Sequence, residues 1–332
     1  MESTGSSTDD RLTLKRHSVQ IQKLVRILLR IAGSLAAIWI STASGHSEAP
    51  ARPKIYGIAF VQFKAVDLQK STAFYSRILG LGSGSYTCRG ALNPCFVVNS
   101  SQRIELVQTR SGDPSSFLKE VGFSTNDVMG MRAYLLAHNV HAAAIERGPN
   151  GLRHFEVADP EGNTIAFEES PGDIQPIERA RQVSRRLFHA GWVVKNLDVE
   201  KKFYCGLLGF RLYWYGGFKD RDVDWYEIQV PDGDNWVEFM LNIPANAGHQ
   251  ELGVQNHFSL GVSDIKAAVI KLRANGLVKF DRPEIGRDGK WSFDIYDPDG
   301  NRVEFMEPRN AQKPCCHPYS AAHPNLMSRQ KN

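Results

Sequence analysis

The 332-residue sequence has almost no net charge outside its N-terminal stretch, and this limits what the protein can bind. Residues 1–55 hold eight of the 40 Lys and Arg and four of the 36 Asp and Glu, which leaves 32 of each sign in the remainder. Nucleic-acid-binding domains carry a basic surface. The neutral remainder therefore argues against a nucleic-acid partner, and its 42% hydrophobic content is typical of globular domains.

The N-terminal stretch lacks an apolar run long enough to cross a membrane with ease. Its apolar segment, Ile31–Ile40, is short, follows the basic residues Lys23, Arg26 and Arg30, and is followed by small residues. A positive segment, a short apolar segment and a small-residue exit are the features of a secretory signal. We expect residues 1–54 to be a signal peptide or an uncleaved N-terminal anchor with a linker. The protein is then periplasmic or secreted, and contacts a membrane only through such an anchor.

Cysteine is scarce, with five residues in the chain. Cys88 and Cys95 flank a loop of turn-forming residues, and in an oxidising compartment they either pair or remain free thiols. Cys205 lies in a predicted helix and is expected in the core. Cys315-Cys316 and His317 stand in a Pro-containing tail and match no zinc-binding spacing, so the cysteines predict no metal site.

The sequence does contain an internal repeat. One pattern is an Asp/Asn-Leu pair followed by Phe-Tyr and then Leu-Gly at equal distances, and it begins at Asp67 and again at Asn196. The other is Asp-Pro-(Glu/Asp)-Gly-Asn, which begins at Asp159 and Asp297. The chain is therefore predicted to be a duplication, with domains at 55–170 and 187–309, a polar linker at 171–186 and a tail at 310–332.

Each half is predicted to contain two units of about fifty residues. In the second half, residues 187–195 have the composition of a strand, and residues 197–207 have helical spacing closed by Gly209. Three β-rich stretches then extend to Asn242, and residues 256–306 repeat the same order. The expected fold class is α+β, with four βαβββ modules paired into two domains.

In these motifs the chain resembles the vicinal oxygen chelate superfamily, which includes glyoxalase I, the extradiol dioxygenases and the bleomycin resistance proteins. The resemblance covers everything except the leader, the linker and the tail. It implies two cup-shaped domains, in which the first strand of a module offers an inward His or Gln as a metal ligand and the last strand offers a Glu. It also implies a small-molecule substrate. A tandem member has all the modules that relatives assemble by dimerisation, so both a monomer and a homodimer remain open.

Counting from the repeated motifs gives four ligand positions in the second domain. Each His lies seven residues before a helix-starting Asp or Asn, and the last Glu lies seven residues after the second Asp-Pro motif; the positions are His189, Glu238, His257 and Glu304. Two core histidines and two ion-paired glutamates would be the structural alternative, but four matches at counted positions favour a metal. Imidazole and carboxylate ligands suit one divalent Fe, Mn, Ni or Zn ion per chain. The resemblance further implies that Glu304 or Glu238 is the catalytic base.

The first domain provides an internal control. Its corresponding positions are Phe60, Glu105, either Lys119 or Glu120, and Ala166. Phe60 and Ala166 have no donor atom, and Glu105 alone keeps a donor at a position of certain register. We therefore expect a metal-free domain that covers the cleft or helps to bind substrate.

The choice of reaction depends on a few further residues. Trp236 and Asn242 share a strand face with Glu238 and are predicted to contact substrate, as is Asp294. Asp294 occupies the position at which extradiol dioxygenases have a catalytic Tyr, and Val193 replaces the basic residue with which glyoxalase I binds glutathione. We predict a metal-dependent lyase or isomerase whose small substrate chelates the ion through adjacent oxygens. The alternatives are an extradiol-type ring-cleaving dioxygenase and a non-catalytic ligand-binding or resistance protein.

Overall fold

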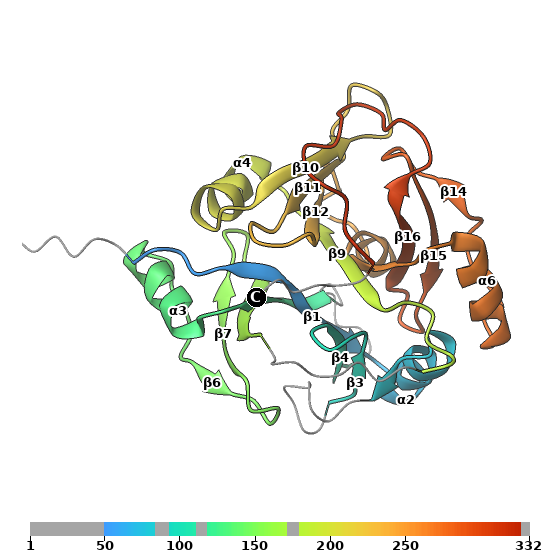
Figure 1. Cartoon of the computed structure of the whole chain (residues 1–332), viewed down its shortest axis with the longest axis horizontal. Coiled ribbons are helices and arrows are strands. Elements are labelled where there is room, and N and C mark those ends of the chain that lie inside the picture. Colours follow the sequence, from blue (N-terminus) through green and yellow to red (C-terminus); the bar gives the residue numbers. More distant parts are fainter. Residues whose placement is uncertain (1–49, 84–92, 111–117, 171–178, 327–332) are drawn as a thin grey trace, which may run out of the picture. The chain divides into compact units, whose positions relative to one another are not determined.

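The computed structural model describes residues 50–83, 93–110, 118–170 and 179–326 (Figure 1). The predicted leader and Cys88 lie outside these ranges, so export and the Cys88–Cys95 pair stay predictions. Among the described residues, no helix has the length and apolar character needed to span a membrane.

The first half of the chain forms two copies of the predicted module in one sheet. The eight strands lie in the order β2-β3-β4-β1-β5-β8-β7-β6. The central pair β1–β5 is antiparallel, and each of these two strands pairs in parallel with the last strand of its own module. The elements are β1 (Ile55–Ala65), α2 (Leu68–Ala73), the π-helical turn η1 (Phe74–Ile78), β2 (Gly82–Ser83), β3 (Cys95–Val97), β4 (Arg103–Gln108), β5 (Leu118–Thr125), α3 (Val128–Ala137), β6 (Glu146–Arg147), β7 (Arg153–Ala158) and β8 (Thr164–Glu169).

The second half repeats this arrangement, with sheet order β10-β11-β12-β9-β13-β16-β15-β14. Two curled sheets of two βαβββ modules each confirm the predicted α+β fold. One helix that the sequence did not predict, α5, lies between the two modules. The elements are β9 (Arg186–Val193), α4 (Leu197–Lys201), η2 (Lys202–Leu207), β10 (Arg211–Gly216), β11 (Trp225–Gln229), β12 (Trp236–Met240), α5 (His249–Gln255), β13 (His257–Gly261), α6 (Ile265–Ala274), β14 (Glu284–Ile285), β15 (Lys290–Tyr296) and β16 (Arg302–Asn310).

The repeated Asp/Asn-Leu pattern marks the start of a helix in both domains. The side chain of Asp67 accepts hydrogen bonds from the backbone N–H groups of Gln69 and Lys70, and that of Asn196 accepts one from Val199. These side chains satisfy backbone donors that the first helical turn leaves free. The motif therefore fixes where each helix begins after the first strand of its module.

The same motifs also join the two domains. The Asp-Pro turn of the fourth module contacts the helix of the first: Tyr75 donates a hydrogen bond to Asp297 over 3.0 Å. In the same joint, Asp299 accepts bonds from the hydroxyl of Ser71 at 2.9 Å and from the backbone N–H of Val66 at 3.1 Å. The two repeated patterns therefore form a contact between opposite ends of the chain.

A matching joint connects the second module to the third. Tyr204 donates to Asp159 over 3.3 Å. The carboxylate of Glu161 accepts hydrogen bonds from the backbone N–H groups of Lys195 and Asn196, immediately before helix α4. The repeated residues found in the sequence thus have a structural role, which is to hold the two sheets together.

This second joint predicts a pH-dependent stability. Glu200 of α4 is fully buried, and burial together with the carboxyl groups of Asp159 and Glu161 raises its pKa from 4.5 to about 8. A carboxyl group whose pKa is raised by folding gives stability that is complete below its unfolded pKa and is lost as the pH rises through its folded pKa. We expect the melting temperature of the wild type to fall relative to that of Glu200→Gln by roughly 5–10 °C between pH 5 and pH 8.5. The melting temperatures are measured by circular dichroism. If they change equally with pH in the two proteins, the raised pKa of Glu200 is contradicted.

Candidate metal centre

The four predicted ligand positions lie on the four central strands of the second sheet, β12, β9, β13 and β16. Strand pairing places Gly191 of β9 opposite both Glu238 and His257, and places Ser259 of β13 between His189 and Glu304. Gly191 is needed there, because a Cβ at this position would lie 2.2 Å from Cε1 of His257. Strand register, and one residue without a side chain, thus direct all four donors into one space.

The donor atoms approach one another closely. The two Nε2 atoms of His189 and His257 are 3.0 Å apart. Oε2 of Glu238 lies 3.1 Å from Nε2 of His257 and 3.5 Å from that of His189. Oε2 of Glu304 lies 3.2 Å from Nε2 of His189. Within the described ranges, His189, Glu238 and His257 form a group of three ligand atoms that could hold an ion, and Glu304 joins it through His189.

These separations fit a common divalent ion. Ligand atoms at about 2.1 Å from one ion, at tetrahedral or octahedral angles, lie roughly 3.0–3.4 Å from each other. The four distances of 3.0, 3.1, 3.2 and 3.5 Å fall at or close to this range. Two imidazoles and two carboxylates also match the donor preference of Fe, Mn, Ni or Zn. His189, Glu238 and His257 therefore suit the predicted ion in type and spacing, and Glu304 approaches this group at His189.

Hydrogen bonds set which nitrogen of His257 faces the cluster. Nδ1 of His257 lies 2.9 Å from the carbonyl oxygen of Gln255, to which it can donate. Nε2 then carries the lone pair, and it accepts from Arg302 over 2.7 Å. Burial lowers the pKa values of both His189 and His257 well below the ordinary value, so both imidazoles are neutral. A neutral imidazole with its other nitrogen fixed by a carbonyl is the form in which histidine binds metals.

The cluster has an excess of acidic groups. Burial, followed by the nearby carboxyl of Asp294, raises the pKa of Glu304 well above its ordinary value. Glu227 on β11 pairs in register with Glu238, and its carboxyl group is also buried. Burial raises the pKa of Glu227 as well. Several buried carboxyl groups around two neutral imidazoles are costly unless cations balance them. Arg302 and Lys290 supply part of that balance, and a divalent ion would supply the rest.

The structure separates the three residues predicted to contact substrate. Asp294 pairs in register with Glu304 and forms an ion pair of 3.6 Å with Arg302, so it lies beside the cluster. Trp236 is fully buried, and its ring centroid is 4.8 Å from that of His189, which places it behind the ligand. Asn242 lies elsewhere.

The structure assigns Asn242 to a turn. Its side-chain amide donates to the carbonyl of Val223 over 3.1 Å and to the carboxylate of Asp224 over 2.8 Å, and its φ is +62°. Asn242 lies two residues beyond Met240, the last residue of β12. The alternation of strand faces on which the prediction relied has already ended there. The side chain of Asn242 therefore stabilises this turn, and its contact with substrate stays a prediction.

Two cations beside the cluster were missed. Arg302 contacts His257, and its position two residues before Glu304 on one strand face was a usable signal. Lys290 is fully buried on β15, and nothing in its sequence context distinguished it from an exposed lysine. A charged residue in a strand is normally expected to face solvent, so the alternation pattern does not predict a buried lysine.

In the first domain, a buried arginine pairs with the acidic residues of the cup. Strand register makes Glu120, and not Lys119, the counterpart of His257, because Glu120 pairs with Gln62 as His257 pairs with Gly191. Glu105, the one acid of certain register, accepts a hydrogen bond of 2.7 Å from Nε of Arg103.

Both terminal nitrogens of Arg103 also donate to Glu168, each over 2.7 Å. Burial alone would lower the pKa of Arg103, but the carboxylates of Glu168 and Glu105 raise it above the ordinary value. The guanidinium of Arg103 is therefore always charged, and it neutralises the acidic groups of the first cup without a metal.

This network predicts a large effect on stability. Arg103→Met would leave Glu105 and Glu168 buried without their cation, so we expect it to lower the free energy of unfolding by about 3–5 kcal/mol. Arg153→Met is the matched control, because Arg153 pairs with Glu169 at a partly exposed site, and this substitution should destabilise the protein far less. Urea unfolding followed by fluorescence measures both, and equal losses would contradict the ion-replacement role.

Comparison with known proteins identifies a sequence family for the domain that contains the cluster. A sequence model of the Glyoxalase/Bleomycin resistance protein/Dioxygenase superfamily matches residues 186–305, the span that contains all four predicted ligands. No curated protein sequence shows significant similarity to the chain.

Solved structures of dioxygenases share the fold. Homoprotocatechuate 2,3-dioxygenase from Brevibacterium fuscum, in an anaerobic complex with 3,4-dihydroxyphenylacetate, matches with a TM-score of 0.56 and 21% identity over 78% of this chain and 82% of that chain. An extradiol ring-cleaving dioxygenase from B. fuscum, determined by serial femtosecond crystallography, matches with a TM-score of 0.60 and 20% identity over 83% of this chain and 76% of that chain. Identities this low establish a shared fold and no shared reaction. Residues 186–305 therefore match the sequence model of the glyoxalase/bleomycin resistance protein/dioxygenase superfamily, and the first half of the chain repeats the fold of the second.

Proposed function

We propose that the second domain is the active site of a metal-dependent lyase or isomerase whose small substrate chelates the ion through two adjacent oxygens. The observation that carries this proposal is the convergence of His189, Glu238 and His257 in one buried group, with Glu304 in contact with His189. Four protein ligands leave two positions of an octahedral ion for such a substrate. The superfamily of residues 186–305 is consistent with this chemistry.

The roles of the side chains follow from their contacts. A bound divalent ion would polarise the substrate oxygens and so lower the cost of removing a proton from the adjacent carbon. Glu238 reaches both imidazoles within 3.5 Å and is the better permanent ligand. Glu304 contacts the imidazole of His189 and faces Asp294 across the strand pair, so its Oε2 is the better acceptor for the substrate proton. Arg302 would offset the charge that develops on the substrate oxygens.

A glutathione adduct is not the expected substrate. Val193 stands where glyoxalase I has a basic residue for glutathione, and a valine side chain cannot pair with a carboxylate. Export, which we propose on the composition of residues 1–54 alone, would also separate the protein from this cytosolic thiol. Small α-hydroxy ketones and related vicinal-oxygen compounds are the substrate class to test.

Ring cleavage by an extradiol-type dioxygenase is the second candidate, because the solved structures with this fold include such enzymes. Two of the ligands would be His189 and His257, as the dioxygenase resemblance implies, with Glu304 as the third. The position of the catalytic Tyr holds Asp294, which is ion-paired with Arg302 and cannot act as a phenol. This substitution is the reason for ranking ring cleavage second.

One parallel assay separates these reactions. The metal-loaded protein is incubated in deuterated water with α-hydroxy ketones or thiohemiacetals, and proton exchange at carbon is followed by NMR; oxygen uptake with catechols is measured on the same sample. Exchange without oxygen uptake supports the lyase or isomerase, and oxygen uptake without exchange overturns it. Tightly bound, redox-silent Zn or Ni would contradict the oxygenase.

A non-catalytic ligand-binding or resistance protein is the third candidate. It predicts metal-dependent binding of a chelating ligand with neither exchange nor oxygen uptake. A binding protein would retain its ligand affinity in Glu304→Gln if Glu304 serves only as a spare ligand, whereas the enzyme would lose turnover in that variant.

A further inference from the structure

The C-terminal tail, predicted as a simple extension at 310–332, lies along the second domain over its described part. We call residues 311–326 the strap; Figure 1 shows it as the red end of the chain near β10, β11 and β12. Its backbone bonds to Gly289 through the N–H groups of Ala311 and Gln312, and Ser320 N–H donates to the carbonyl of Tyr213. The strap is therefore attached to two strands, β10 and the start of β15.

Apolar side chains of the strap cover a small cluster next to the metal ligands. The cluster consists of Phe188, Tyr213, Trp236 and Met306, and the strap residues packed on it are Tyr319, Ala321 and Leu326. Phe188 directly precedes the ligand His189 on β9. The strap thus packs on a cluster that reaches His189 through the ring of Trp236.

Tyr319 of the strap completes an aromatic cage around Lys290. The ammonium nitrogen of this fully buried lysine lies 4.5 Å from the ring centroid of Tyr319, 4.7 Å from that of Trp236 and 4.9 Å from that of Tyr213. The hydroxyl of Tyr319 also donates to Asp288 over 3.1 Å. A desolvated cation is attracted by the electron-rich faces of the aromatic rings around it, and this attraction is stronger than at an exposed site.

The cage continues to a metal ligand. Trp236 contacts Lys290 and also packs against His189, with ring centroids 4.8 Å apart. The ring of His257 is oriented by the hydrogen bond between its Nδ1 and the carbonyl of Gln255. Nδ1 of His189 has no hydrogen-bond partner within the described residues, so its ring is oriented by packing on Trp236 instead. The position of the His189 ring therefore depends on Trp236, and that of Trp236 on the lysine cage.

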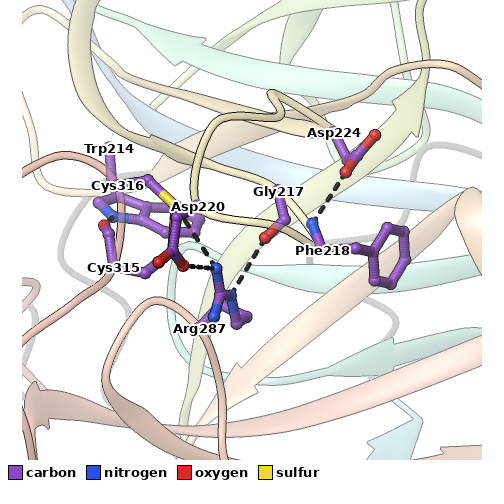
Figure 2. Close-up of a disulfide and its surroundings, with 8 residues drawn as sticks. All are labelled: Trp214, Gly217, Phe218, Asp220, Asp224, Arg287, Cys315 and Cys316. Atoms are coloured by element: carbon purple, nitrogen blue, oxygen red, sulfur yellow. Dashed lines mark hydrogen bonds and ion pairs between the residues drawn. A yellow bond between two sulfur atoms is a disulfide. The ribbon is translucent and has the colours of Figure 1, made fainter.

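A disulfide between adjacent cysteines anchors the start of the strap (Figure 2). Cys315 N–H donates to the carbonyl of Arg287 over 2.8 Å, and the indole N–H of Trp214 donates to the carbonyl of Cys315 over 3.3 Å. The guanidinium of Arg287 lies 3.8 Å from the sulfur of Cys316, which is exposed, and also binds Asp220. The sulfur pair thus lies at a polar surface that a reductant can reach.

We propose that the strap positions the metal ligand His189 through Tyr319, Lys290 and Trp236, and that the Cys315–Cys316 disulfide sets how firmly it does so. This rests on the proposed metal site. A dithiol would reduce the disulfide: it becomes a disulfide itself, and its two protons and two electrons leave Cys315 and Cys316 as thiols. The released thiols no longer hold the backbone of the strap in its anchored turn.

The test measures Mn²⁺ affinity on the full chain by calorimetry. Tyr319→Ala removes one face of the cage, and we expect it to weaken Mn²⁺ binding by about 10–100-fold, the range found for groups that orient metal ligands. Tyr319→Phe keeps the ring and should restore affinity to within about threefold of wild type. Lys313→Ala, at an exposed position of the same strap, is the matched control and should bind as wild type does.

Should Tyr319→Ala fail to fold, Tyr319→Leu fills much of the same volume but offers no aromatic face, and it should show the same loss. Wild type that binds no Mn²⁺ contradicts the proposed function. Wild type that binds Mn²⁺ with an affinity that neither Tyr319→Ala nor Tyr319→Leu changes contradicts the strap proposal alone.

The redox part is tested on the same protein with a water-soluble phosphine. The phosphine reduces the disulfide, water supplies the oxygen of the phosphine oxide and the two thiol protons, and mass spectrometry confirms the product. We expect reduction to weaken Mn²⁺ binding several-fold, and the double variant Cys315→Ser/Cys316→Ser to match the reduced protein. This variant keeps Cys88 and Cys95, so its Mn²⁺ affinity must not change when the phosphine is added, even if that pair is reduced. Unchanged affinity after confirmed reduction overturns the role of the disulfide.

Discussion

Replacing His257 by alanine is expected to weaken binding of Mn²⁺ or Zn²⁺ by more than about a hundredfold. Its Nε2 lies within 3.1 Å of donor atoms from both His189 and Glu238, so it forms the centre of the cluster. Loss of a group that only orients a ligand already costs 10–100-fold, and loss of a ligand costs more. Calorimetric titration of the purified, metal-stripped protein measures the change.

His141→Ala is the matched control for this experiment. His141 is an exposed histidine of the first domain, and its removal should leave the affinity unchanged. An unchanged affinity in His257→Ala, together with tight binding by wild type, would place the ion elsewhere in the chain and remove the basis of the proposed function.

Replacing Glu304 by glutamine is expected to lower the rate of substrate proton exchange by about 10²–10⁴-fold, the contribution of a positioned general base. Glutamine keeps the shape and can still contact His189, but it cannot accept a proton at the pH of the assay. The ion should stay bound, because Glu238 and both imidazoles remain.

Glu238→Gln distinguishes the two carboxylates. Because Glu238 contacts both imidazoles, its variant should lose metal affinity first and activity as a consequence. The assignment of the base fails if Glu304→Gln retains full exchange activity, or if Glu238→Gln keeps the ion and loses the activity.

The repeated motifs were enough to predict the fold. Asp67 and Asn196 begin helices because their side chains cap them, and local capping and strand patterns are readable from neighbouring residues alone. The pairing of Tyr75 with Asp297 was not predicted, since residues so far apart in sequence meet only once the whole chain has folded. The sequence therefore predicted the helices and strands, but it did not predict the contacts between the two domains.

The metal cluster was predicted for a related reason. His189, His257 and Glu304 lie at fixed distances from capping residues and turns, so counting along the chain located them. Asn242 does not share the strand face of Glu238, because β12 ends at Met240 and Asn242 lies in the turn that follows. Lys290 and Arg103 escaped because their burial depends on partners from distant strands, which a pattern of alternating residues does not show.

The strap was missed altogether. Its sequence has few strand or helix signals, and its residues acquire order only by packing on a preformed surface around Tyr213. The spacing of Cys315, Cys316 and His317 matches no zinc-binding pattern, and no disulfide between the two cysteines was predicted from the sequence. Adjacent cysteines form a disulfide without any spacing pattern, so a search by spacing could not find them.

The central claim is that the second cup holds one divalent ion between His189, Glu238, His257 and Glu304. The most direct test is an anomalous difference map from crystals of the full chain grown with Mn²⁺. We predict a single strong peak within about 2.0–2.3 Å of both Nε2 atoms and of an oxygen of each carboxylate. A map without a peak at this position, or with its strongest peak in the first domain, would contradict the account.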